Sequence, residues 1–294
     1  MNITRLVIHR LHQTPLSRAI RRSPTLNHFA ERWWVASQSR IFLQGLRGIR
    51  APQGSPSGAT PAGQSPPSIP PLEDAVAKLP AYVAAGEDFS AEMARHCSTS
   101  KFLSVTVRRD SCGYQDIYAQ ILRHLRGKAA KMLEIGIGVN DPTSPSGMPA
   151  EHVTGASLVG WSRYFPGGEI HGADVDPRCM QQSESFTTHL VDQRDPASLE
   201  RLGDRIGGDL DLVVDDGLHT PEANINVMAA FMPLLAPTGL LVIEDISAEF
   251  DTLWFRAQKE MPSEYTMTYF PSSVLRQFRG AGGQGGIAVI ARHQ

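Results

Sequence analysis

Short apolar runs recur along the second half of the chain, and stretches with apolar residues at helical spacing separate them. Strands are expected over 131–136, 169–174, 188–191, 210–215, 239–245, 265–270 and 286–291. Helices are expected over 72–85, 115–125, 155–164, 196–206, 221–235 and 249–260. Short apolar strands that alternate with helices are typical of a mostly parallel sheet covered on both faces. The pattern predicts an α/β fold with a doubly wound, mostly parallel seven-stranded sheet and an N-terminal extension.

Charge is distributed unevenly along the chain. Residues 1–72 contain nine arginines, no lysine and one acid, Glu31, although the whole chain has a net charge of −2. From Ala51 to Leu72 the sequence is rich in Pro, Gly and Ser, and such a stretch cannot bury a core. We therefore divide the chain into a basic N-terminal extension (1–50), a linker (51–72) and the α/β domain (73–294).

Three interpretations of residues 1–50 stay open at this point. The segment could be a poorly ordered or partly helical extension. It could be a basic amphipathic stretch that rests on an anionic membrane surface or on a partner protein. It could also be a cleaved organellar transit peptide, because such peptides are rich in arginine and poor in acids.

The cysteine content and the hydropathy pattern indicate a cytoplasmic protein. Cys97, Cys112 and Cys179 form no CxxC pair and no disulfide framework, which favours a reducing compartment. No run of about 18 apolar residues is present, so no transmembrane segment is expected. The N-terminus lacks the continuous apolar core of a secretory signal.

The first predicted strand ends in a glycine turn. In an open parallel sheet, ligands bind at the carboxyl ends of the strands, where the strand order reverses. Gly136 and Gly138 allow the backbone to turn sharply and to approach a ligand. A dinucleotide-binding oxidoreductase would need a third glycine and an immediate helix, whereas a long insert, Val139–Thr154, follows here. Glu134 adds negative charge near the turn, which suits a methionine sulfonium better than a diphosphate.

The next two strands also end in polar residues. Asp174 follows the second strand, and a carboxylate at this position can accept both ribose hydroxyls of a nucleotide. The alternative is a strand-end acid that is merely solvated. Asp192 and Gln193 follow the third strand and could bind an adenine edge.

Four acids and a histidine follow the fourth and fifth strands: Asp215, Asp216, His219, Glu244 and Asp245. Clustered carboxylates repel one another and are costly to desolvate unless a cation offsets their charge. Oxygen ligands of this kind suit Mg²⁺. The histidine, next to such a metal, would be a natural general base near neutral pH. The alternative is that these acids cap helices and bind backbone amides, and that the histidine is structural.

The segment from Leu133 to Ile246 resembles the class I S-adenosylmethionine-dependent methyltransferases. It is most similar to the metal-dependent sugar O-methyltransferases of macrolide biosynthesis, of the mycinamicin and macrocin type. The resemblance is carried by EIGIG (134–138), GASLVGWSRYFPGGEIHGADVD (155–176), DQ (192–193), DDGLH (215–219) and IEDI (243–246). DDGxH followed by IED is the specific part, and nothing in residues 1–72 resembles the auxiliary domain of the macrolide enzymes.

The resemblance implies a Rossmann-like methyltransferase sheet and a role for each matching residue. The metal ligands would be Asp216, Glu244 and Asp245, and the general base His219. The cofactor contacts would be Glu134, Gly136, Gly138, Asp174, Asp192 and, in holding the methionine moiety, Tyr114. The insert 139–154, with Glu151 and His152, is expected to fold over the acceptor as a lid.

The expected activity is Mg²⁺-assisted methyl transfer from S-adenosylmethionine to a hydroxyl of a sugar, a glycosylated natural product or a polysaccharide. The acceptor would be a small molecule or glycan. A metal-independent small-molecule methyltransferase of the same fold and a catalytically silent scaffold with a surface-binding N-terminus are the alternatives. Nucleic acid is not expected as a substrate, because residues 73–294 are net acidic and lack a basic, aromatic-lined face. Association into a homo-oligomer stays open.

Overall fold

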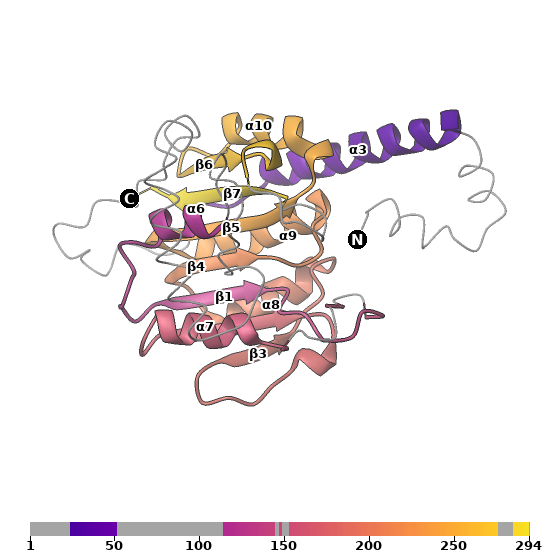
Figure 1. Cartoon of the computed structure of the whole chain (residues 1–294). Helices are drawn as coiled ribbons and strands as arrows, with labels where there is room; N and C mark the ends of the chain where they lie inside the picture. The colour runs from indigo at the N-terminus through magenta and orange to yellow at the C-terminus, as the bar shows by residue number, and fades with distance from the viewer. Residues whose placement is uncertain (1–23, 52–113, 145–146, 149–152, 276–284, 294) are drawn as a thin grey trace.

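A seven-stranded sheet forms the centre of the computed structural model, which describes residues 24–51, 114–144, 147–148, 153–275 and 285–293 (Figure 1). The strand order is β3-β2-β1-β4-β5-β7-β6. The strands are β1 (Lys131–Ile135), β2 (Glu169–Asp174), β3 (Thr187–Leu190), β4 (Leu210–Asp215), β5 (Leu235–Ile246), β6 (Tyr265–Phe270) and β7 (Gly286–Arg292). Strands β1 to β5 are parallel, and β7 is antiparallel to both β5 and β6. The predicted doubly wound, mostly parallel sheet is confirmed.

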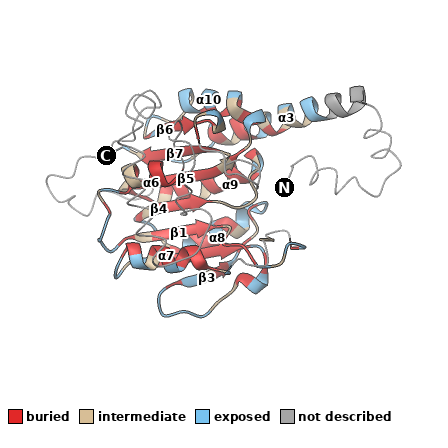
Figure 2. Ribbon diagram, in the orientation of Figure 1, coloured by how far each residue is buried: buried red, intermediate tan, exposed pale blue. Residues whose placement is uncertain are grey.

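Helices cover both faces of the sheet. One face carries α6 (Tyr114–Ile121) and α7 (Ala156–Tyr164), and the other carries α3 (Pro24–Leu46), α8 (Pro196–Ile206), α9 (Pro221–Phe231) and α10 (Asp251–Lys259). Short 3₁₀ segments are η1 (Pro177–Cys179), η2 (Met232–Leu234), η3 (Ala248–Phe250) and η4 (Ser272–Val274). Figure 2 shows the sheet as a buried layer between the helices of the two faces. Each face therefore has its own hydrophobic core.

Local sequence determines where several helices begin and end. Asp195 and Thr220 precede prolines at the first positions of α8 and α9, and their side chains accept hydrogen bonds from the first-turn amides of Ala197 and Ala223. The expected helix 221–235 ends earlier, at Phe231. Pro233 lacks an N–H for a longer α-helix, so the chain forms η2 and enters β5 at once.

Helix α3 lies within the segment expected as a basic extension, and its last turns join the core on the α9 side. Phe42 and Leu46 are fully buried, and the Phe42 ring lies 4.8 Å from that of Trp254. Earlier in the helix, Gln38 accepts a hydrogen bond from the Glu222 amide at 3.1 Å. The division of the chain at residue 50 stays a prediction, but this helix packs on the sheet domain.

Two expected features lie outside the described residues: the helix over 72–85 and all of the linker 51–72 except Ala51. Among the residues that the structure describes, no helix combines the length and apolar character needed to cross a bilayer.

Replacing Phe42 by alanine tests the packing of α3. We expect Phe42→Ala to lower the free energy of unfolding by about 3–5 kcal/mol, because it removes a fully buried ring. Gln44→Ala, at an exposed position of the same helix, should change it by less than about 0.5 kcal/mol. Urea unfolding of the full chain followed by circular dichroism measures both values. Equal values for the two variants would contradict the packing described here.

Two buried histidines join β2 to the edge strand β3. His171 Nδ1 lies 3.0 Å from His189 Nε2, and His171 Nε2 lies 2.9 Å from a carboxylate oxygen of Glu169. Burial, together with the neighbouring His171, lowers the pKa of His189 to about 4. The folded protein therefore favours neutral His189.

The low pKa of His189 predicts that the folded protein loses stability in mild acid. In the unfolded chain the pKa of His189 returns to about 6.5, so the unfolded state binds the proton more tightly. The contribution is complete above about pH 6.5 and is lost as the pH falls towards 4. We expect the free energy of unfolding to fall by roughly 1–2 kcal/mol between pH 7 and pH 5, and His189→Gln to remove most of this slope. Denaturant titrations across this range test it, and an unchanged slope in the variant would refute it.

Candidate active site

The glycine turn after β1 crosses the backbone that leaves β4. Gly136 and Gly138 have φ values of 91° and 69°, in the left-handed region that glycine tolerates. A Cβ atom on Gly136 would lie 2.3 Å from the carbonyl oxygen of Asp216, so no larger residue fits here. The Asp216 amide also donates to the carbonyl of Ile135 at 2.9 Å. The turn and the β4 end are therefore in direct contact at the point where the strand order reverses.

Two predicted cofactor residues, Glu134 and Asp174, are buried beside this turn. Glu134 accepts a hydrogen bond from Ser157 Oγ at 2.6 Å. Asp174 accepts one from the Gly138 amide at 3.0 Å and another from the Asp176 amide at 2.9 Å. Its carboxylate therefore holds the glycine turn against the end of β2.

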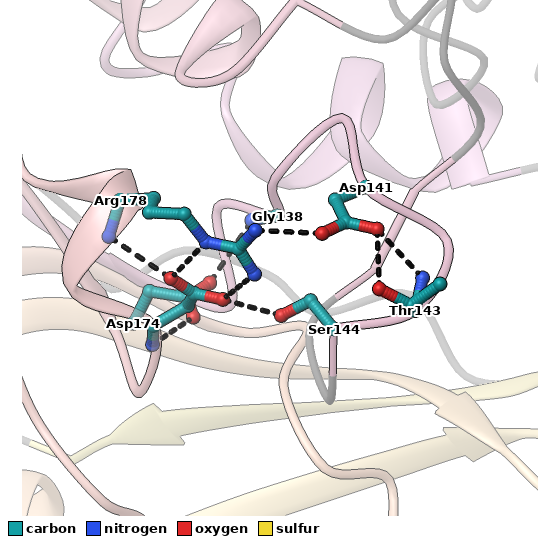
Figure 3. A network of polar contacts seen from close by, with 7 residues as sticks. Gly138, Asp141, Thr143, Ser144, Asp174 and Arg178 are labelled. Carbon is teal, nitrogen blue, oxygen red and sulfur yellow. Dashed lines mark hydrogen bonds and ion pairs between the residues drawn. The ribbon is translucent and has the colours of Figure 1, made fainter.

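The first part of the insert is attached to the β2–β3 connection by the polar network in Figure 3. Arg178 binds Asp176 and Asp141, each at 2.6 Å, and Ser144 Oγ donates to Asp176. Hydrogen bonds from Thr143 and Arg178 lower the pKa of Asp141 to about 2. The remaining part of the expected lid, with residues 151 and 152, lies outside the described residues, so the lid stays a prediction.

The two residues after β3 point to different partners. Asp192 is partly exposed and pairs with Arg194 at 2.6 Å. Gln193 is buried: its Nε2 donates to Asp215 Oδ1 at 2.6 Å, and its Oε1 accepts from the Leu218 amide at 2.7 Å. The Gln193 side chain therefore holds the β4 loop, although the sequence had suggested that it could bind an adenine edge.

Asp215 has a structural environment. It is fully buried and accepts hydrogen bonds from Gln193, from Asn224 Nδ2 at 2.9 Å and from the Gly217 amide at 3.3 Å. Burial raises the pKa of Asp215. Of the two acids in DDGLH, this one therefore binds amides, as the alternative interpretation proposed.

Asp216, His219 and Asp245 form the cluster that could hold a metal ion. One ligand atom from each lies within 4.8 Å of the others, and His219 Nε2 is 3.9 Å from Asp245 Oδ2. His219 and Asp245 have φ values of 55° and 53°, a left-handed conformation that is rare for residues with a Cβ. Such conformations cost of order 1–3 kcal/mol each and persist only where the surrounding structure holds them.

Glu244 and Tyr114 each make a hydrogen bond at the end of β5. Glu244, a predicted ligand, is buried and accepts a hydrogen bond from the Tyr118 hydroxyl. Tyr114, predicted to lie at the methionine moiety, donates a hydrogen bond from its hydroxyl to Asp245 Oδ1 at 2.8 Å. Tyr118 was missed, although its four-residue spacing from Tyr114 would have placed both on one helix face.

Comparison with known proteins bears out the resemblance to macrolide-sugar O-methyltransferases, although no family model matches the chain. It is 34% identical over 138 residues to 8-demethyl-8-alpha-L-rhamnosyl tetracenomycin-C 2'-O-methyltransferase of Streptomyces olivaceus, covering 47% of this chain and 34% of that protein. It is 35% identical over 129 residues to demethylmacrocin O-methyltransferase of Streptomyces fradiae, covering 44% and 30%.

A third relative, mycinamicin VI 2''-O-methyltransferase of Micromonospora griseorubida, is 33% identical over 129 residues, covering 44% of this chain and 30% of that protein. Each match therefore spans about a third of the relative's length. Among solved structures, MycE methyltransferase from the mycinamycin biosynthetic pathway, in complex with Mg and SAH, has a TM-score of 0.49 and 23% identity, covering 71% of this chain and 55% of that one.

Removing the Gln193 side chain tests its role in holding the β4 loop. Gln193→Ala leaves buried Asp215 without one of its donors, so we expect the free energy of unfolding to fall by about 1–3 kcal/mol. Arg194→Ala removes only a partly exposed ion pair next to it and should cost less than about 1 kcal/mol. Urea titration compares the two variants. A Gln193→Ala variant as stable as the Arg194→Ala variant would contradict the assignment.

Proposed function

We propose that the chain is an S-adenosylmethionine-dependent O-methyltransferase that uses Mg²⁺ to methylate a hydroxyl of a sugar-bearing small molecule or glycan. The observation that carries the proposal is the cluster of Asp216, His219 and Asp245 beside the glycine turn of β1. Relatives over 129 to 138 residues are named as O-methyltransferases of sugar-bearing compounds, which supports the acceptor class. Because each match spans about a third of the relative, the activity of the whole protein is part of the proposal.

The proposed cofactor site consists of Glu134, Gly136, Gly138, Asp174 and Asp192. Its residue types suit S-adenosylmethionine, because acids at the ends of β1, β2 and β3 place negative charge near a sulfonium cation, and the glycine turn lets backbone amides approach a ligand. S-adenosylmethionine supplies an electrophilic methyl group when bound. Tyr114 is proposed to complete this site next to the methionine moiety, while its hydroxyl is hydrogen-bonded to Asp245.

The proposed metal site uses carboxylate oxygens of Asp216, Glu244 and Asp245. This donor set suits Mg²⁺, which prefers oxygen ligands and keeps several waters. Bound Mg²⁺ would lower the pKa of a coordinated acceptor hydroxyl. The chain's carboxylates thereby fix where the acceptor oxygen lies relative to the glycine turn.

His219 is the proposed general base. Its Nδ1 is buried without a hydrogen-bond partner in the described part of the chain, and its Nε2 is the nitrogen close to Asp245. A neutral imidazole in this orientation accepts the proton of the acceptor hydroxyl as the carbon–oxygen bond forms. The partly exposed position of the ring lets that proton pass to solvent afterwards.

Titration calorimetry and a labelled-methyl assay test the proposal. We expect the full chain to bind S-adenosylmethionine and to transfer its methyl group to a member of a panel of glycosylated small molecules, glycans and phenols. His219→Ala should lower turnover by about 10²- to 10⁴-fold and leave cofactor affinity unchanged, because the histidine acts only on the acceptor proton. His293→Ala, near the C-terminal end and outside the cluster, should keep full turnover.

Two outcomes would overturn the proposal. Full activity in excess chelator would indicate a metal-independent methyltransferase. Failure to bind S-adenosylmethionine with or without Mg²⁺ would indicate a catalytically silent scaffold.

A further inference from the structure

We infer that Tyr114 and Tyr118 of α6 are positioning residues that hold the two acids at the end of β5, Asp245 and Glu244, in the arrangement that the metal cluster requires. The inference rests on the proposed function, since it concerns the same metal site. Each tyrosine acts through the carboxylate to which its hydroxyl is bonded.

Helix α6 is suited to this task because it presents both tyrosines on one face. Residues four apart on an α-helix lie one above the other, and both tyrosines are buried in the core that α6 shares with α7 and the sheet. Glu244 and Asp245 are consecutive in β5, within an irregularity of the strand between Ile243 and Ile246, and Asp245 has a left-handed φ of 53°. The regular alternation of side chains between the two faces is interrupted there, so one helix reaches both acids.

Tyr114 binds Asp245 at two points. Its hydroxyl lies 2.8 Å from Asp245 Oδ1 and accepts a hydrogen bond from the Asp245 amide at 2.9 Å. Gly285 packs against the same residue: a Cβ atom there would lie 2.5 Å from the Asp245 Cα, and the Gly285 carbonyl oxygen lies 2.9 Å from the Tyr114 hydroxyl. A tyrosine and a glycine therefore both contact Asp245, whose φ is unusual.

As a result, the two oxygens of the Asp245 carboxylate have different partners. Oδ1 is used by Tyr114 and, at 3.3 Å, by the Gly285 amide. Oδ2 is the oxygen near His219 Nε2, at 3.9 Å, and it is left for the cluster. Without the hydroxyl, the carboxylate could rotate, and the cluster would lose a preoriented ligand.

Tyr118 supplies a neutral donor where several acids meet. Its hydroxyl donates to Glu244 Oε1, and the charges of Glu134 and Asp216 lie close enough to act on it. Both Tyr118 and Glu244 are almost completely buried. A neutral hydroxyl compensates the desolvation of Glu244 without adding a positive charge that would repel a metal ion.

Metal affinity separates this role from a purely structural one. Partners of metal ligands typically change metal affinity by about 10- to 100-fold when they are removed. We expect Tyr114→Phe and Tyr118→Phe each to weaken Mn²⁺ binding by about 10- to 100-fold, measured as free Mn²⁺ by electron paramagnetic resonance on the full chain. Mn²⁺ is used because it shares the oxygen ligands of Mg²⁺ and is paramagnetic.

Tyr269→Phe is the matched control. Tyr269 is also buried, and its hydroxyl donates to Asp251 at 2.5 Å, so the substitution removes the same kind of bond outside the cluster. We expect this variant to bind Mn²⁺ like the wild type, although its melting temperature falls. If Tyr118→Phe does not fold, Tyr114→Phe carries the test, because Tyr114 is slightly less buried than Tyr118.

The outcomes distinguish this inference from the proposed function. Wild-type protein that binds no Mn²⁺ overturns the metal site and the inference with it. Wild-type protein that binds Mn²⁺, with tyrosine variants that bind it equally well, overturns the positioning role alone. An equal loss of affinity in Tyr269→Phe also overturns it, because general loosening of the fold would then explain the effect.

Discussion

The burial of several carboxylates at the carboxyl ends of the strands is the constraint on which the rest of the site depends. Four carboxylates there are almost completely inaccessible to solvent: Glu134, Asp174, Asp215 and Glu244. Burying a carboxylate without hydrogen bonds is costly, and like charges nearby increase the cost. Each of these acids accepts hydrogen bonds from neutral donors, which are a serine, backbone amides, side-chain amides and a tyrosine. This compensation allows the acids to be buried where a sulfonium cofactor and a divalent cation are proposed to bind.

The helices on the two faces then have related roles. On one face, α6 reaches the acids at the end of β5 through its tyrosines. On the other face, α3 contacts the segment that follows His219 and the segment that follows Asp245. Gln38 binds the first turn of α9, three residues after His219, and Trp34 packs against Phe250 of η3, at 5.2 Å between ring centroids. The left-handed backbone of His219 and Asp245 is thus supported from both sides of the sheet.

Much of this arrangement follows from local sequence. The doubly wound, mostly parallel sheet could be anticipated, because apolar strands that alternate with helices leave few topologies. The acids of DDGLH and IEDI then fall at the ends of the strands β4 and β5, which are neighbours in the sheet. The role of Gln193 could not be anticipated, because its partners at Asp215 and Leu218 are more than twenty residues away. The same holds for Tyr114, whose hydrogen bond to Asp245 spans 131 positions.

The sequence by itself determined the fold class, and it predicted the end of the sheet where ligands would bind and the residue types available for a cofactor and a metal. These features depend on periodicity and on residues close together in the chain. Only the tertiary structure decided which partners each acid has. Asp215 is hydrogen-bonded to amides, Glu244 is hydrogen-bonded to the Tyr118 hydroxyl, and Asp216 and Asp245 lie close to His219. It also decided that α3 belongs to the core. Burial and hydrogen bonding depend on which distant segments pack together, and that information is absent from any local pattern.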